Sequence, residues 1–200
     1  MASASGCVLP AGSPALVPGP GAKASTLTCR LVPKGGGRST LHLSGSLHPA
    51  WAGRLAAGLA ARQVSVVRAA ARRGSTRWTA EIEIEVPEGI VEPSAIDFVA
   101  LMKEPRAPEA GGPVALASWR VQPTRTDVEV ELRAGDAVGF LGRALLVFAE
   151  LGLFPRAMRV ETVGGAVRDL FLLQGAGGER PPDGVVSLLR RRLAGLVPED

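Results

Sequence analysis

The residue types that most often carry enzyme chemistry are scarce in this chain. Its 200 residues include only two cysteines, Cys7 and Cys29, and two histidines, His42 and His48. The chain therefore has too few histidines and cysteines to favour a hydrolytic triad or a histidine-rich metal site. The sequence also offers no nucleophile–base pair and no phosphate-binding loop. We predict a protein that is not an enzyme, with no catalytic residues, no metal and no cofactor.

One segment has the chemistry of a ligand site. Residues 136–139, Asp-Ala-Val-Gly, lie at the start of an apolar run, 138–151, that is predicted to be helical. A helix N-terminus presents unpaired N–H groups and a positive dipole end, which suit an anionic group such as a carboxylate. Gly139 would let a ligand approach the backbone, and Asp136 would bind a positively charged group of that ligand. The alternatives are that Asp136 only caps the helix and that Gly139 only serves the turn.

Composition and charge bear on whether the chain has a membrane or a nucleic acid as a partner. Hydrophobic residues make up 46% and charged residues 21% of the chain, which is typical of a globular protein. The longest apolar stretches, such as 144–149, are too short to span a membrane, and no export signal is recognised. The net charge of +4 is modest, and glutamates at 81, 83 and 85 would repel phosphate. With too few cysteines for a disulfide framework, we expect a cytoplasmic protein without a membrane or nucleic-acid partner.

The same order of elements is predicted twice, at an offset of 89 residues that brings Val64 onto Leu153 and Ile82 onto Phe171. In the first half we predict strands at 25–32, 39–47, 64–69 and 78–86 and helices at 49–61 and 93–103. In the second half we predict strands at 114–121, 127–133, 156–163 and 166–173 and helices at 138–151 and 183–196, the last capped by Asp183. The predicted organisation is a flexible leader (1–23), a first domain (24–105), a linker (106–112) and a second domain (113–200).

This order of elements predicts an α+β fold. A right-handed crossover places the third strand of a βαββα unit beside its first, and the strand that precedes the unit fills the other edge. Each half would then be a ferredoxin-like unit, an antiparallel sheet with helices on one face. Apolar alternation predicts the strand pairs Cys29–Leu43 and Leu31–Leu41 in the first hairpin, and Trp119–Val130 and Val121–Val128 in the second.

The second half resembles an ACT domain. Residues 128–141 read Val-Glu-Val-Glu-Leu-Arg-Ala-Gly-Asp-Ala-Val-Gly-Phe-Leu, which is similar to the family motif of an apolar strand followed by D-x-P-G-x-L, with Val138 in the place of the proline. The helix, 151–153 and 168–171 continue the likeness. Over about residues 25–197 the chain resembles the tandem ACT region of the bifunctional uridylyltransferase/uridylyl-removing enzymes of bacterial nitrogen control. Their catalytic domains have no counterpart here, so no catalytic activity is implied.

The resemblance implies a regulatory module that binds a small ligand, commonly an amino acid, between two ACT units. In that family the turn before one helix and a small or polar residue on the second strand of the partner unit form the pocket. The residues of this chain at those positions are Asp136, Ala137, Val138, Gly139, Phe140, Leu141 and Ser65. The equivalent of Ser65 is the bulky Phe154, and the equivalent turn, 47–50, lacks the acid and the glycine. A second, equivalent site would be formed by the 47–50 turn and Phe154, and we call it the mirror site. We therefore expect the mirror site to be lost.

Apolar surfaces leave more than one functional interpretation open. The helix at 138–151 is apolar nearly all round, and the strand at 170–173 is apolar on both faces, so the halves should dock side by side or the chain should form a homodimer. We expect a non-enzymatic regulatory module with an amino-acid ligand, and a homodimer partner or an effector protein. The alternatives are a structural dimerisation scaffold with a vestigial pocket and, less favoured, a nucleic-acid binder through the arginine-rich first half.

Overall fold

The computed structural model describes residues 27–75, 77–103 and 115–198, so the predicted leader and linker lie outside the described residues. The first half contains β1 (Thr28–Gly35), β2 (Arg38–Gly45), α1 (Trp51–Ala60), β3 (Ser65–Arg73), β4 (Trp78–Glu85), the 3-10 turn η1 (Pro93–Ala95) and α2 (Phe98–Lys103). The second half contains β5 (Ser118–Pro123), β6 (Val128–Gly135), α3 (Phe140–Glu150), β7 (Leu153–Val163), β8 (Ala166–Gly175) and α4 (Asp183–Ala194). Within these ranges no helix combines the length and hydropathy needed to cross a bilayer.

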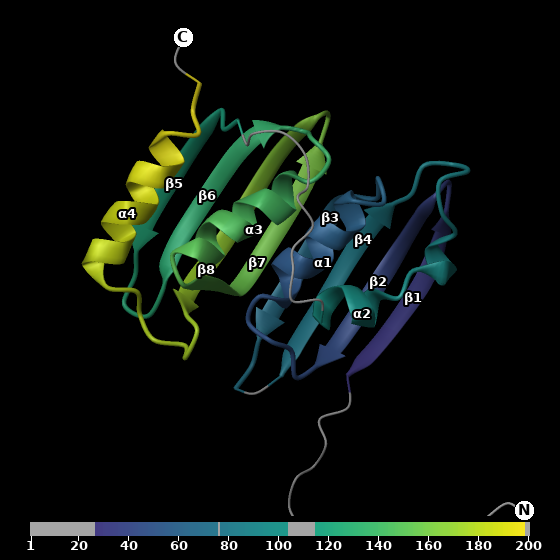
Figure 1. Ribbon diagram of the computed structural model, residues 1–200, viewed down its shortest axis with the longest axis horizontal. Helices are drawn as coiled ribbons and strands as arrows, with labels where there is room; N and C mark the ends of the chain where they lie inside the picture. Colours follow the sequence, from purple (N-terminus) through teal and green to yellow (C-terminus); the bar gives the residue numbers. More distant parts are fainter. Residues whose placement is uncertain (1–26, 76, 104–114, 199–200) are drawn as a thin grey trace, which may run out of the picture.

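The strands form one antiparallel sheet, and the predicted α+β class is confirmed. The strand order is β1-β2-β4-β3-β7-β8-β6-β5, and helices α1 to α4 lie on one face of the sheet (Figure 1). In the first half β4 pairs with β2, and β1 occupies the other edge of β2. In the second half β8 and β5 flank β6 in the same way. This is the strand order predicted from the crossover rule.

The two halves dock side by side through both layers. Strand β3 pairs with β7, and α1 packs against α3. The β3–β7 register opposes Ala70 to Arg159, residues that are equivalent by the 89-residue offset. The neighbouring pairs, Ala69–Val160 and Ala71–Met158, are arranged symmetrically about this one. The halves are therefore related by a local twofold axis at this point, and side-by-side docking is the arrangement that covers the apolar flank of α3.

One hairpin register is confirmed and the other is wrong. β1 and β2 pair Cys29 with Leu43 and Leu31 with Leu41, as predicted. In the second hairpin Val121 pairs with Val130 rather than Val128, and Trp119 pairs with Leu132. The cause is a tight turn over residues 124–127, in which the Thr124 N–H donates to the Asp127 carbonyl at 2.9 Å and the Asp127 N–H donates to the Thr124 hydroxyl at 3.0 Å. The shift is two residues, so the same faces remain inward.

The predicted start of the helix at 93–103 and the predicted cap of the last helix differ from the structure. The helix predicted over 93–103 is divided into η1 and α2, because the carboxylate of Asp97 accepts a hydrogen bond from the Ala100 N–H at 2.9 Å and starts a new helix. Asp183 is the first residue of α4 rather than its cap. Pro182 precedes the helix, and its carbonyl accepts the Val186 N–H at 3.1 Å. Asp183 instead pairs with Arg180 in front of the first turn.

Helices α1 and α3 approach closely because glycine lies at their contact. A Cβ atom added at Gly142 would lie 3.0 Å from the backbone N and 3.2 Å from the Cα of Ala57. Gly53, the equivalent residue of α1, would place a Cβ 3.3 Å from that of Leu145. The Ala/Gly-rich sequence of the first helix predicts such a close approach, and this prediction is confirmed.

We expect Gly142→Val to lower the free energy of unfolding by about 2 kcal/mol, because the atoms that its side chain meets are backbone atoms that cannot rotate away. Urea unfolding measures the change. The matched control is Gly184→Ala in α4, where an added Cβ meets nothing within 4 Å. It should raise stability by about 0.5–1 kcal/mol through helix propensity. Equal midpoints for wild type and Gly142→Val would contradict the close helix contact.

Candidate ligand-binding site

The residues predicted to bind a ligand line one pocket between the two halves. Strand β3 supplies one wall from the first half, and the turn before α3 with β7 and β8 supplies the rest from the second. The lining residues are Ser65, Val66, Asp136, Ala137, Val138, Gly139, Phe140, Leu141, Val160, Thr162, Val167 and Asp169. Its volume of about 30 Å³ has room for about two water-sized groups. The β3–β7 pairing thus brings Ser65 to the turn of the opposite half.

Gly139 determines how the turn enters α3. The helix begins at Phe140, two residues later than predicted, and Gly139 precedes it with a left-handed φ of 84°. The Gly139 carbonyl accepts the N–H of Arg143 at 3.1 Å, as the residue before a helix does. A side chain at this φ would be strained, so the glycine has at least the turn role that the sequence left open.

Asp136 does not cap the helix. It lies four residues ahead of Phe140, its side chain is exposed, and no side-chain hydrogen bond caps α3. Its backbone N–H donates to the carbonyl of Gly165 at 2.9 Å, which anchors the start of the turn to the β7–β8 loop. The interpretation of Asp136 as a helix cap is therefore wrong. Its carboxylate lies at the rim of the pocket.

The inner wall of the pocket carries an acid that sequence reasoning missed. Asp169 on β8 is 0% exposed and lies in the inward-facing row with Val167 and Phe171. Neither oxygen of its carboxyl group has a hydrogen-bond partner among the described residues. Burial raises the pKa of Asp169 to about 7; the nearby backbone N–H of Glu161, which falls short of hydrogen-bond geometry, lowers that pKa by a smaller amount. An inward-facing acid in an otherwise apolar row was the available signal.

The charged side chains that line the pocket are both acidic, Asp136 at the rim and Asp169 inside. The hydroxyls of Ser65 and Thr162 are the other polar side-chain groups of the lining. Together with the N-terminus of α3, these groups can bind a molecule that has both a positive and a negative end.

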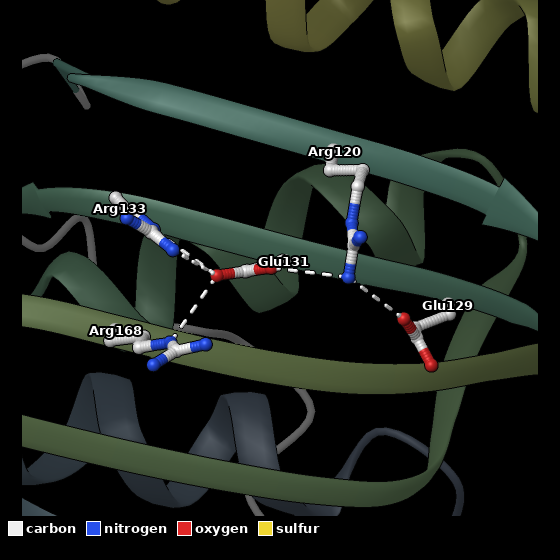
Figure 2. A network of polar contacts seen from close by, with 5 residues as sticks. All are labelled: Arg120, Glu129, Glu131, Arg133 and Arg168. Atoms are coloured by element: carbon white, nitrogen blue, oxygen red, sulfur yellow. Dashed lines mark hydrogen bonds and ion pairs between the residues drawn. The ribbon is translucent and has the colours of Figure 1, made fainter.

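Three arginines of the second half, Arg120, Arg133 and Arg168, form ion pairs on the face of the sheet opposite the helices. Glu131 lies 2.9 Å from Arg133, 3.2 Å from Arg168 and 3.3 Å from Arg120, and Arg120 also lies 3.4 Å from Glu129. Figure 2 shows Glu131 among these three arginines. The hydrogen bond from Arg133, together with the charges of the three arginines, lowers the pKa of Glu131. This face therefore presents mixed charges rather than a patch of one sign.

The position equivalent to the pocket in the other half is open and mostly apolar, with Arg54 of α1 as the charged residue of its lining. Its cavity of about 180 Å³ is lined by Pro49 and Ala50 of the equivalent turn, by Phe154 and Pro155 of β7, and by residues of α1 and α3. The equivalent of Asp169 is Ala80. The mirror position therefore lacks the buried acid but keeps a cavity.

Two tryptophans also distinguish the first half from the second. Trp51 and Trp78 stand where the second half has Phe140 and Val167, and their rings pack edge to face with centroids 5.6 Å apart. No protein-family model and no curated protein matches this chain, so the assignment of the candidate site rests on the residue geometry described above.

Proposed function

We propose that the chain is a non-enzymatic regulatory module that binds an amino acid between two ferredoxin-like, ACT-type units. The observation that carries the proposal is the pocket in which Ser65 of one half faces the Asp136–Leu141 turn of the other. A ligand held by both halves would favour the arrangement of the halves that it binds most tightly. The output then requires an effector protein, or a second copy of the chain, whose affinity differs between arrangements.

The pocket is smaller than the amino acid that it is proposed to bind. An amino acid needs more than about 30 Å³, so we expect the pocket to widen when the ligand enters, through movement of the turn before α3. The turn is suited to this movement because Asp136 and Ala137 are exposed and Val138 is 50% exposed. We expect the free protein to favour the closed arrangement, with ligand selecting an open one.

Glutamine is the first ligand to test, because the chain resembles the tandem ACT region of nitrogen-control enzymes. The proposal includes a cytoplasmic location and a role in nitrogen metabolism on the same ground. The alternative function, a structural dimerisation scaffold, is favoured by the apolar cavity between α1, α3 and β7 beside Leu146, which is 44% exposed.

A thermal-shift screen against the twenty amino acids tests the proposal. A ligand at a hundred times its dissociation constant should add about 2.7 kcal/mol to stability. Ser65→Phe, which introduces the residue found at the equivalent position 154, should abolish the shift by filling the pocket. The control Ser118→Phe, at an exposed position on the edge strand β5, should leave it intact. Absence of a shift with every amino acid would reject the proposal in favour of the scaffold.

A further inference from the structure

Asp169 is an unusual residue for the interior of this sheet. Its side chain is fully buried, both of its carboxyl oxygens lack a hydrogen-bond partner among the described residues, and it lines the pocket. A buried polar group without a partner costs free energy, and a buried charge costs more. The equivalent position in the first half holds Ala80, which is buried at no such cost. The fold therefore does not need an acid at this position.

The nearby backbone N–H of Glu161 falls short of hydrogen-bond geometry, so the described residues do not supply a full partner for the Asp169 carboxyl group. The lining contains no lysine, arginine or histidine, and Asp136 is the other titratable side chain of the lining. On the neighbouring strands, Glu161 is paired with Arg159 at 2.7 Å and Arg168 with Glu131 at 3.2 Å, away from the pocket. Both carboxyl oxygens are shielded from solvent in this arrangement, so a ligand group would reach them only when the pocket widens.

We propose that Asp169 binds the positively charged amine of the ligand, so that the site selects compounds with an α-amino group over the same carboxylic acids without it. This inference rests on the proposed function and assigns the chemical class of its ligand. The amine would donate hydrogen bonds to both free carboxyl oxygens in a region that excludes water, where such a pair is stronger than at the surface.

Asp169, rather than Asp136, is the residue expected to decide this selectivity. Asp136 is exposed at the rim, and water screens its interaction with an ammonium group. Asp169 is buried, so a ligand that lacks a positive group would leave the carboxyl without a partner and would gain little there. The site should therefore bind such analogues more weakly, because the carboxyl group of Asp169 stays without a hydrogen-bond partner in their complexes.

The test compares each of the twenty amino acids with the carboxylic acid of the same skeleton without the α-amino group, for example glycine with acetate and L-alanine with propionate. Thermal shifts are measured at pH 8, where Asp169 is ionised, at constant ionic strength, for wild type, Asp169→Asn and Asp136→Asn. We expect the shift from amine-bearing compounds alone. Asp169→Asn should weaken their binding at least tenfold, with a smaller loss in Asp136→Asn.

The outcomes separate this inference from the proposed function. Equal shifts from an amino acid and its amine-free analogue, with undiminished binding to Asp169→Asn, would overturn the role of Asp169 and leave a ligand site between the halves. Absence of a shift from every compound of both series would overturn both proposals. Circular dichroism and the melting temperature of Asp169→Asn establish that the variant is folded, and we expect it to be at least as stable as wild type at pH 8.

Discussion

The free energy of unfolding should fall by roughly 4 kcal/mol between pH 4 and pH 8 through Asp169 alone, and Asp169→Asn should remove that part of the fall. The carboxyl of Asp169 ionises near 3.8 in the unfolded chain, whereas burial holds its pKa at about 7 in the folded protein. Between these values the folded state binds more protons than the unfolded state. The contribution of Asp169 to stability is therefore highest below the unfolded pKa, decreases as the pH rises and levels off above about 7.

The difference between wild type and variant isolates this effect. The pKa values of Asp127, Glu131 and Glu161 are lowered in the folded protein, so these groups make stability rise with pH over the acidic range. They are present in both proteins and cancel in the comparison. Urea unfolding at several pH values gives the two curves, with Asp136→Asn as the control. Parallel curves for wild type and Asp169→Asn would contradict a buried acid without a partner.

Asp127→Ala should lower the free energy of unfolding by about 3 kcal/mol at neutral pH. Asp127 is 3% exposed, and both of its carboxyl oxygens accept hydrogen bonds from Arg156 at 2.9 Å, with a third bond from the Thr126 hydroxyl at 2.7 Å. Burial opposes ionisation of Asp127, but the hydrogen bonds from Arg156 and Thr126 outweigh it and lower its pKa. The pair ties the β5–β6 turn to β7, so its loss releases both.

A double-mutant cycle with Arg156→Ala measures the coupling directly. The exposed pair Arg180–Asp183, with a similar N–O distance of 3.0 Å, provides the control and should couple by less than about 1 kcal/mol. Because the pKa of Asp127 is lowered, its contribution should be lost as the pH falls through the folded pKa. A coupling as small as that of the control pair would show that the contact is not formed as described.

Side-chain alternation predicted the strands better than their registers. In the first hairpin the apolar sets of 27–31 and 41–43 leave one register, and it is the observed one. In the second hairpin, registers two residues apart keep the same faces inward, so alternation could not separate them. The turn chemistry of Thr124 and Asp127 decided between them. The division of η1 from α2 likewise depends on one local hydrogen bond to Asp97, within an otherwise helical pattern.

Part of the candidate site was predictable because the 89-residue repeat and the ACT-like motif identify residues of the same pocket. The offset of 89 residues and the family resemblance assigned Ser65 and the Asp136–Leu141 turn to one pocket, and the structure brings them together. Asp169 was missed because it lies within the strand predicted at 166–173, whose apolar residues were enough to explain the segment as part of the core. Its role emerges from the absence of a partner in the described structure, a property that no single-sequence pattern reveals.

A titration of ¹⁵N-labelled protein with L-glutamine, or with whichever amino acid raises the melting temperature most, tests whether the two halves share one ligand site. We expect saturable shifts of the amide signals of Ser65 on β3 and of Gly139 and Phe140 in the turn, with a single dissociation constant for both halves. Shifts confined to the apolar cavity beside Phe154 and Leu146, or to one half alone, would contradict a ligand site shared between the halves.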